Sequence, residues 1–275
     1  MPKPNQKKWI MPILWTAVIV LMGWFMLRKF EYSQVYHPSR ALAANADELH
    51  RPFEELFLPV ENNGAIHGWF FPAATNGALK EKVFLVCHGN AGNIGDRLDL
   101  ASLLLNLGAN VLLFDYRGYG RSTGRPSEEG TYQDAMAAYQ WLRQKNFQGT
   151  NILAYGESLG GGIATELALR QPLGALILQS TFTSIPDVGA EIFPWLPVRL
   201  IGTIQYDTRH KLPEIKIPVL ILHSPDDGLV AFHHAEENFA AANSPKYLVK
   251  LSGDHNDALS SAPSEIETAI RQLLK

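Results

Sequence analysis

Short apolar runs alternate with helical patterns along most of the chain. Six runs are typical of buried strands, at 83–87, 111–114, 152–155, 175–178, 219–222 and 247–251. The spacing of apolar residues predicts helices at 96–107, 128–146, 159–170, 232–242 and 264–274. Because strands that alternate with helices are typical of parallel sheets, this region predicts an α/β fold with a mostly parallel, doubly wound sheet.

Two further strand-like segments come before this region, at 53–60 and 65–71. The sequence Glu61-Asn62-Asn63-Gly64 between them favours a tight turn, so we expect an antiparallel hairpin at the start of the sheet. We therefore place one α/β domain over residues 53–275, after a connector at 30–52.

One segment interrupts the alternation of strands and helices. Residues 182–212, between the strand patterns at 175–178 and 219–222, are rich in proline and bulky apolar side chains such as Phe193 and Trp195. A simple crossover helix does not need this composition. We therefore expect a small helical cap over the carboxyl edge of the sheet, and an extended crossover packed on the domain is the alternative.

The chain begins with an apolar leader at 1–29. Its residues 9–27 contain no charged side chain, and a membrane-spanning helix needs about 20 predominantly apolar residues. Arg28 and Lys29 follow directly, where a secretory signal peptide would have a small-residue cleavage site, so an uncleaved anchor is favoured. We expect a single-pass membrane protein, and basic residues on both sides of the span leave its orientation open.

The charge distribution gives no indication of nucleic-acid binding. The chain of 275 residues has a net charge of −3, and its five basic residues before position 30 belong to the apolar leader. Cys87 is the one cysteine, so no intrachain disulfide can form, and no cysteine- or histidine-based zinc motif is present. The glycine-rich stretch at 115–124 departs from the spacing of a dinucleotide loop. We predict neither a metal nor a cofactor.

The sequence Gly156-Glu157-Ser158-Leu159-Gly160 fits the pattern G-x-S-x-G. It lies between a predicted strand and a predicted helix, which is the context in which this pattern holds a nucleophilic serine on a sharp turn. A serine that merely caps the helix would give the same short pattern. The choice therefore depends on whether a base and an acid follow Ser158.

An acid and a base do follow, in the order serine, acid, histidine. Asp226 and Asp227 come after the strand pattern at 219–222, and His255 comes after the one at 247–251. Because the carboxyl ends of parallel strands meet at one edge of a sheet, these side chains are expected near Ser158. The spacing alone does not distinguish Asp226 from Asp227.

Other histidines are weaker candidates for the base or offer a different kind of site. A metal site formed by His233 and His234 with Asp227 is one such alternative, although two adjacent histidines are poorly placed for tetrahedral coordination. We therefore keep His255 as the candidate base.

The loop at 88–93 is the candidate source of oxyanion-binding groups. It is rich in glycine and follows the strand pattern at 83–87, so its backbone N–H groups can point towards Ser158. We expect the N–H of Asn90, with Ala91 as the second choice, to act together with the N–H of Leu159. His88 fits better as a residue that fixes the loop than as the base.

Several motifs together carry a family resemblance. From about Tyr36 to the C-terminus, the chain resembles the membrane-anchored α/β-hydrolases, which include human depalmitoylating serine hydrolases and their fungal and bacterial relatives. The motifs are Tyr36-His37-Pro38, the 88–93 loop, Asp115-Tyr116-Arg117-Gly118-Tyr119-Gly120, the Ser158 turn and His223…Asp227. Two features depart from the family: Ser224 replaces the usual glycine, and the cysteine-rich N-terminus of the mammalian members is absent.

The resemblance implies an α/β-hydrolase fold and a triad of Ser158, Asp227 and His255. The family's acid stands four residues after the histidine that ends the strand, which favours Asp227 over Asp226. We therefore expect a serine hydrolase that cleaves carboxylic ester or thioester bonds through an acyl-enzyme, with lipophilic acyl groups as substrates. A peptidase or amidase on the same fold, or a non-catalytic membrane-tethered binding protein, is the alternative.

Overall fold

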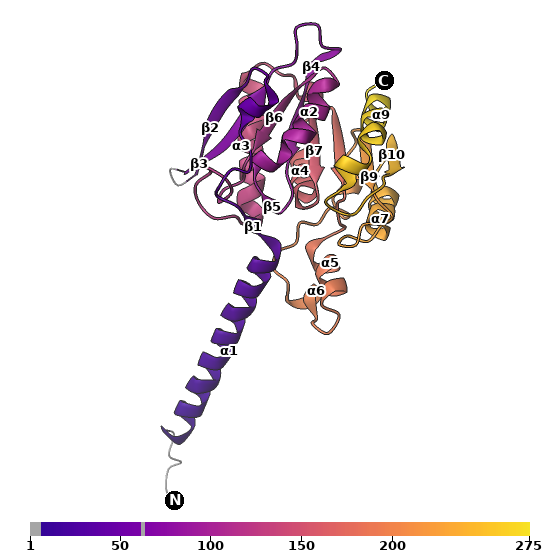
Figure 1. Ribbon diagram of the computed structural model, residues 1–275. Coiled ribbons are helices and arrows are strands. Elements are labelled where there is room, and N and C mark those ends of the chain that lie inside the picture. Colours follow the sequence, from indigo (N-terminus) through magenta and orange to yellow (C-terminus); the bar gives the residue numbers. More distant parts are fainter. Residues whose placement is uncertain (1–6, 62–63) are drawn as a thin grey trace, which may run out of the picture.

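The computed structural model describes residues 7–61 and 64–275, and its centre is an eight-stranded sheet (Figure 1). The strands lie in the order β10-β9-β8-β7-β4-β6-β3-β2. Their bounds are β2 Glu54–Val60, β3 Gly64–Phe71, β4 Leu79–Cys87, β6 Ala109–Phe114, β7 Ile152–Glu157, β8 Ala175–Gln179, β9 Val219–His223 and β10 Lys246–Lys250. Every neighbouring pair from β10 to β6 is parallel, which confirms the predicted mostly parallel sheet.

The two remaining pairs extend this sheet with an antiparallel hairpin. Strands β2 and β3 pair antiparallel, with Val60 opposite Gly64, and β3 pairs antiparallel with β6. The hairpin was predicted from its turn sequence, of which Asn62 and Asn63 lie outside the described residues.

Helices cover both faces of the sheet. The larger ones are α2 Leu98–Asn106, α3 Glu128–Gln144, α4 Leu159–Arg170, α7 His233–Ala241 and α9 Pro263–Leu273, and the short ones are α8 Ala258–Ser261, η1 Ala46–Leu49, η2 Ile94–Arg97, η3 Gly149–Asn151 and η4 Leu212–Glu214. Apolar residues of α3, α4 and α7 share one buried cluster, and those of α2 and α9 share another. In β4, Val83 and Leu85 join the first cluster while Phe84 and Val86 join the second, as the alternation of side chains along a strand requires.

Helix α1, Lys7–Val35, projects from the domain as a long stem (Figure 1). None of the helices in the described part of the chain is both long enough and apolar enough to cross a membrane. The span predicted over 9–27 is therefore not supported, and residues 1–6 of the predicted leader lie outside the described residues. The apolar pattern located a helix correctly, but it could not reveal that the helix continues to Val35 and packs its last turns on the domain.

Two short helices lie between β8 and β9, in the segment where a cap was predicted: α5 Ile185–Ile192 and α6 Val198–Ile201. Helix α5 begins where the Ser184 hydroxyl accepts the backbone N–H of Asp187, a typical N-cap. The Oε1 atom of Glu31 on α1 accepts the N–H groups of Thr203 (2.6 Å) and Ile204 (2.9 Å). Stem and cap are therefore held against each other.

Candidate active site

Ser158 lies on a strained turn between β7 and α4. Its φ of 51° and ψ of −115° are unusual for a residue with a side chain. The backbone is crowded on both sides of it, because a Cβ on Gly156 would lie 2.5 Å from the Gly160 carbonyl oxygen and one on Gly160 would lie 1.9 Å from that of Cys87. Only glycine fits at these two positions, so packing explains the glycines of the G-x-S-x-G pattern.

The structure brings Ser158, His255 and Asp227 together in a hydrogen-bonded series. The Oγ atom of Ser158 lies 3.0 Å from His255 Nε2, and His255 Nδ1 lies 2.7 Å from Asp227 Oδ2. An ionised carboxylate can only accept, so Nδ1 carries the proton and Nε2 is free to accept the serine hydroxyl proton. The three residues come from the carboxyl ends of β7, β10 and β9, at one edge of the sheet.

Asp227, rather than its neighbour Asp226, is the acid in this series. It is buried at 7% exposure, whereas Asp226 is exposed. Its Oδ1 atom accepts the N–H groups of Leu229 (3.0 Å) and Val230 (2.8 Å). The Nε2 atom of His223, which donates to the Val230 carbonyl oxygen, lies 3.4 Å from Asp227 Oδ2.

These contacts determine the charge of Asp227. Burial alone would raise the pKa of its carboxyl group, but the interactions with His223, His255 and the Val230 N–H outweigh burial and hold that pKa well below its usual range. The carboxylate is therefore ionised at neutral pH, which is the form that can orient His255.

Asp254 connects the two loops that carry the acid and the base, and sequence reasoning missed it. Its Oδ1 atom accepts the N–H of Gly228 (2.8 Å) and that of His255 (2.7 Å), which lowers the pKa of its carboxyl group. The side chain thereby ties the loop after β9 to the loop after β10. Its position directly before the candidate base was the one indication available in the sequence.

The candidate oxyanion donors lie at two backbone positions near the Ser158 turn. Among the described residues, neither the N–H of Asn90 nor that of Leu159 has a hydrogen-bond partner. Leu159 is the first residue of α4, where N–H groups have no partner within the helix. The loop containing Asn90 is close to this turn, since a Cβ on Gly89 would lie 3.4 Å from Glu157 Oε1.

A small second sheet fixes the loop of Asn90. Its first strand lies in the segment at 36–40, which the sequence predicts to be extended and which contributes to the family resemblance. Strand β1, His37–Pro38, pairs in parallel with β5, Ala91–Gly92. The N–H of His37 donates to the carbonyl oxygen of Asn90 (3.0 Å), and the hydroxyl of Tyr119 donates to the same oxygen (2.8 Å). These two hydrogen bonds fix the peptide plane that carries the Ala91 N–H. The plane that carries the Asn90 N–H is held instead at the Gly89 carbonyl oxygen, which accepts from His88 Nδ1.

His88 and the loop at 115–124 support this region from within the domain. His88 Nδ1 donates to the Gly89 carbonyl oxygen (2.7 Å), and burial lowers the pKa of His88 to about 3, so the side chain is neutral. The hydroxyl of Tyr116 donates to the carbonyl oxygen of His88 (2.8 Å). Asp115 is buried beneath the loop and accepts the N–H of Ile94 (2.9 Å). These contacts give His88 a positioning role in the loop.

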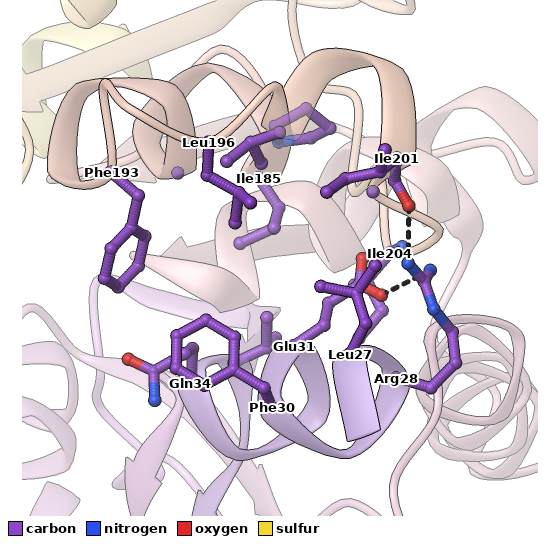
Figure 2. Close-up of a pocket in the computed structure, with 15 residues that line it drawn as sticks. Leu27, Arg28, Phe30, Glu31, Gln34, Ile185, Phe193, Leu196, Ile201 and Ile204 are labelled. Atoms are coloured by element: carbon purple, nitrogen blue, oxygen red, sulfur yellow. Dashed lines mark hydrogen bonds and ion pairs between the residues drawn. The ribbon is translucent and has the colours of Figure 1, made fainter. Parts of the chain in front are cut away.

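A separate apolar cavity lies between α1 and the cap (Figure 2). Its volume is about 70 Å³, and it is lined by apolar side chains such as Phe30, Ile185 and Phe193. Arg28 closes one side of it by hydrogen bonds to Glu31 (2.7 Å) and to the Ile201 carbonyl oxygen (2.6 Å), as Figure 2 shows. Its lining does not include Ser158, His255 or Asp227, so this cavity is separate from the candidate active site.

Comparison with known proteins gives both sequence relatives and structural neighbours. A family model described as the alpha/beta hydrolase fold matches residues 82–202. The alpha/beta hydrolase domain-containing protein WAV2 of Arabidopsis thaliana is 31% identical over 273 residues, which cover 87% of this chain and 85% of that protein. The lysophosphatidylserine lipase ABHD12 of Danio rerio is 37% identical over 186 residues, 60% of this chain and 48% of that protein.

A solved structure agrees at the level of the fold. An esterase of Pyrococcus furiosus superimposes with a TM-score of 0.72 at 20% sequence identity, covering 87% of this chain and 96% of that one. The narrower resemblance to membrane-anchored depalmitoylating enzymes is not tested by these comparisons and stays a prediction.

Proposed function

This chain belongs to the α/β-hydrolase family, and from that membership we propose that it hydrolyses carboxylic ester or thioester bonds. The observation that carries the proposal is the series of two hydrogen bonds from Ser158 through His255 to Asp227. The names of two similar proteins, a lipase and an esterase, agree with an ester substrate.

The proposed mechanism has two steps. His255 Nε2 takes the proton of the Ser158 hydroxyl as Oγ attacks the carbonyl carbon, and the N–H groups of Asn90 and Leu159 stabilise the oxyanion. His255 then gives this proton to the leaving alcohol or thiol, which leaves an acyl group on Ser158. In the second step His255 activates water, which releases the acid and restores the serine. Asp227 stabilises the imidazolium that forms in both steps.

We further propose that the acyl group is lipophilic. The cap exposes large apolar side chains, with Trp195 at 75% and Leu200 at 84% exposure, and one relative is a lipase of a lysophospholipid. Turnover of p-nitrophenyl acetate, octanoate and palmitate tests this proposal. We expect kcat/KM to rise from acetate to the longer esters, and a Trp195→Ser variant to lose activity only on the longer ones. A preference for acetate in both the wild-type chain and Trp195→Ser would contradict a lipophilic substrate.

A fluorophosphonate probe tests the proposed nucleophile on the full-length chain. We expect one adduct, on the peptide that contains Ser158, and its loss in His255→Ala. The control is His210→Ala, because His210 is an exposed histidine whose side chain pairs with Asp207 and makes no hydrogen bond to Ser158, His255 or Asp227. An adduct on another serine, or none on folded protein, would contradict the mechanism.

The leaving group is tested by matched ester, thioester and amide substrates with the same acyl chain. We expect ester and thioester cleavage to exceed amide cleavage, because alkoxide and thiolate leave more easily than an amine. Faster cleavage of the amide would replace our proposal with a peptidase or amidase on the same fold.

A further inference from the structure

Three metal-ligating side chains meet where the cap touches the domain, apart from the Ser158 series. Glu191 lies on α5, and His233 and His234 begin α7. Glu191 Oε1 lies 3.1 Å from His233 Nε2 and 3.3 Å from His234 Nε2. All three donor atoms fall within 4.8 Å of one another, and the two imidazole rings are stacked.

Two of the three distances between these donor atoms match the edges of a tetrahedral metal site. Zinc binds imidazole nitrogen and carboxylate oxygen at about 2.0–2.2 Å, so two ligand atoms on one tetrahedral ion lie about 3.3–3.5 Å apart. The two carboxylate–imidazole distances here are close to that value. Sequence reasoning had disfavoured a site here because adjacent histidines are poorly placed for tetrahedral coordination, and it had paired them with Asp227. The structure instead places the Glu191 carboxylate of the cap beside both rings.

The buried histidine has a ring nitrogen without a hydrogen-bond partner, and this nitrogen faces the cluster. His234 is 1% exposed, and its Nε2 atom makes no hydrogen bond although Glu191 Oε1 is 3.3 Å away. Its Nδ1 atom lies 2.8 Å from the hydroxyl oxygen of Thr183, and that hydroxyl donates to Asp187 (2.9 Å). The backbone N–H of Thr183 also points at Nδ1, at 3.3 Å. For Nε2 to bind an ion, Nδ1 must carry the proton and donate it to the Thr183 hydroxyl oxygen, whose own proton is directed at Asp187. Metal-binding histidines are commonly oriented by such a partner on their second nitrogen.

We propose that Glu191, His233 and His234 bind one divalent transition metal ion, with zinc as the best match. Two imidazole nitrogens and one carboxylate are a common zinc ligand set, and three protein ligands leave a fourth position for water. The side chains of His233 and Glu191 are 46% and 38% exposed, so an ion can enter from solvent. The ion would join α5 of the cap to α7 of the domain and restrict movement of the cap.

Zinc binding to the full-length, chelator-treated protein tests this proposal. After gel filtration with zinc, we expect one tightly held equivalent per chain by elemental analysis. Zinc at 100 times its Kd should raise Tm by roughly 5–10 °C, because a ligand that binds only the folded state stabilises it. Retention of less than half an equivalent, with no change in Tm, would overturn the proposal.

Variants of the two exposed ligands locate the ion without disturbing the core. We expect Glu191→Gln and His233→Ala each to weaken zinc binding by at least about 10-fold. His210→Ala controls for binding at an exposed histidine, and His255→Ala controls for zinc at the Ser158 series; both should retain the equivalent. Full binding by Glu191→Gln and His233→Ala, or its loss only in a control, would overturn the proposal. The Tm and retention measurements do not depend on hydrolase activity.

Discussion

Asp227 illustrates how neighbouring donors decide the state of a single residue. Both carboxylate oxygens face donors: backbone N–H groups on one side, and His255 and His223 on the other. Asp226, one position earlier, is exposed and has none of these side-chain contacts. The two aspartates are therefore a matched pair with the same chemistry and different surroundings.

This pair allows a sharp test of the proposed orienting acid. Asp227→Asn should lower kcat by about 10⁴-fold, because an amide stabilises neither the required tautomer nor the imidazolium of His255. Asp226→Asn should change kcat by less than about twofold, since surface substitutions away from a site have small effects. Steady-state turnover of a p-nitrophenyl ester measures both. Equal losses in the two variants would contradict the assignment of Asp227.

Asp187 in the cap is a second single residue whose surroundings decide its charge, and it predicts how stability depends on pH. Burial opposes its ionisation, but hydrogen bonds from Arg199, Ser184 and Thr183 lower the pKa of Asp187 to about 2. A depressed pKa stabilises the folded chain above the unfolded value of about 3.9, and this contribution disappears as pH falls through the folded value. The stability difference between wild type and Asp187→Asn should therefore shrink between about pH 5 and pH 2. Urea unfolding at a series of pH values measures it, and a constant difference would contradict the prediction.

At the scale of elements, helix α4 can leave the Ser158 turn only because its second residue, Gly160, lacks a side chain. A Cβ on Gly160 would nearly overlap the Cys87 carbonyl oxygen at the end of β4, whereas a Cβ on Gly23 in α1 would meet nothing within 4 Å. The two helical glycines thus differ in packing and share the same helical propensity.

We expect Gly160→Ala to destabilise the protein by about 3 kcal/mol or more, because the strand or the helix must move to admit the methyl group. Gly23→Ala should leave global unfolding unchanged and favour helix α1 by up to about 1 kcal/mol. Chemical denaturation monitored by circular dichroism measures the free energy of unfolding of both variants. A Gly160→Ala variant as stable as wild type would mean that β4 and α4 are less closely packed than described.

Hydrogen bonds from the cap to Glu31 help to join the stem and the cap, beside those of Arg28. The Glu31 carboxylate accepts two backbone N–H groups of the cap segment, at Thr203 and Ile204, and also pairs with Arg28. Glu31→Ala should therefore increase hydrogen exchange at 203–204 several-fold without unfolding the sheet. Glu267→Ala is the control, because Glu267 pairs with Arg271 on the exposed face of α9. Unchanged exchange in Glu31→Ala would show that Arg28 and the apolar cavity contacts hold the cap without Glu31.

At the scale of the whole molecule, the proposed catalytic residues all lie at one edge of the sheet. The loops after β7, β9 and β10 supply Ser158, Asp227 and His255, and the segment between β8 and β9 forms the cap near α1 (Figure 1). Parallel strand order places these loops side by side although they lie far apart in sequence.

Localisation in a membrane stays a prediction from the apolar leader. Large apolar side chains of α1, such as Trp15 and Phe25, are more than half exposed in the isolated chain. Fractionation of cells that express the tagged full-length chain tests it: the protein should sediment with membranes and resist a salt wash. Recovery in the soluble fraction would contradict the predicted localisation.

The sequence by itself determined the α/β class, the parallel strands, the hairpin and the glycine-flanked turn of Ser158. These features depend on local backbone geometry and on the periodicity of burial, both of which leave a direct pattern in neighbouring residues. It also limited the acid to Asp226 or Asp227, and the family resemblance favoured the latter.

Only the tertiary structure decided which distant groups meet. It placed the Asp254 carboxylate between two loops, paired His37 with the loop of Asn90, and packed the last turns of α1 against the cap. It also supplied Glu191, rather than Asp227, to the adjacent histidines 233 and 234. Such contacts depend on where strands end and how layers pack, so no pattern within a short stretch of sequence specifies them.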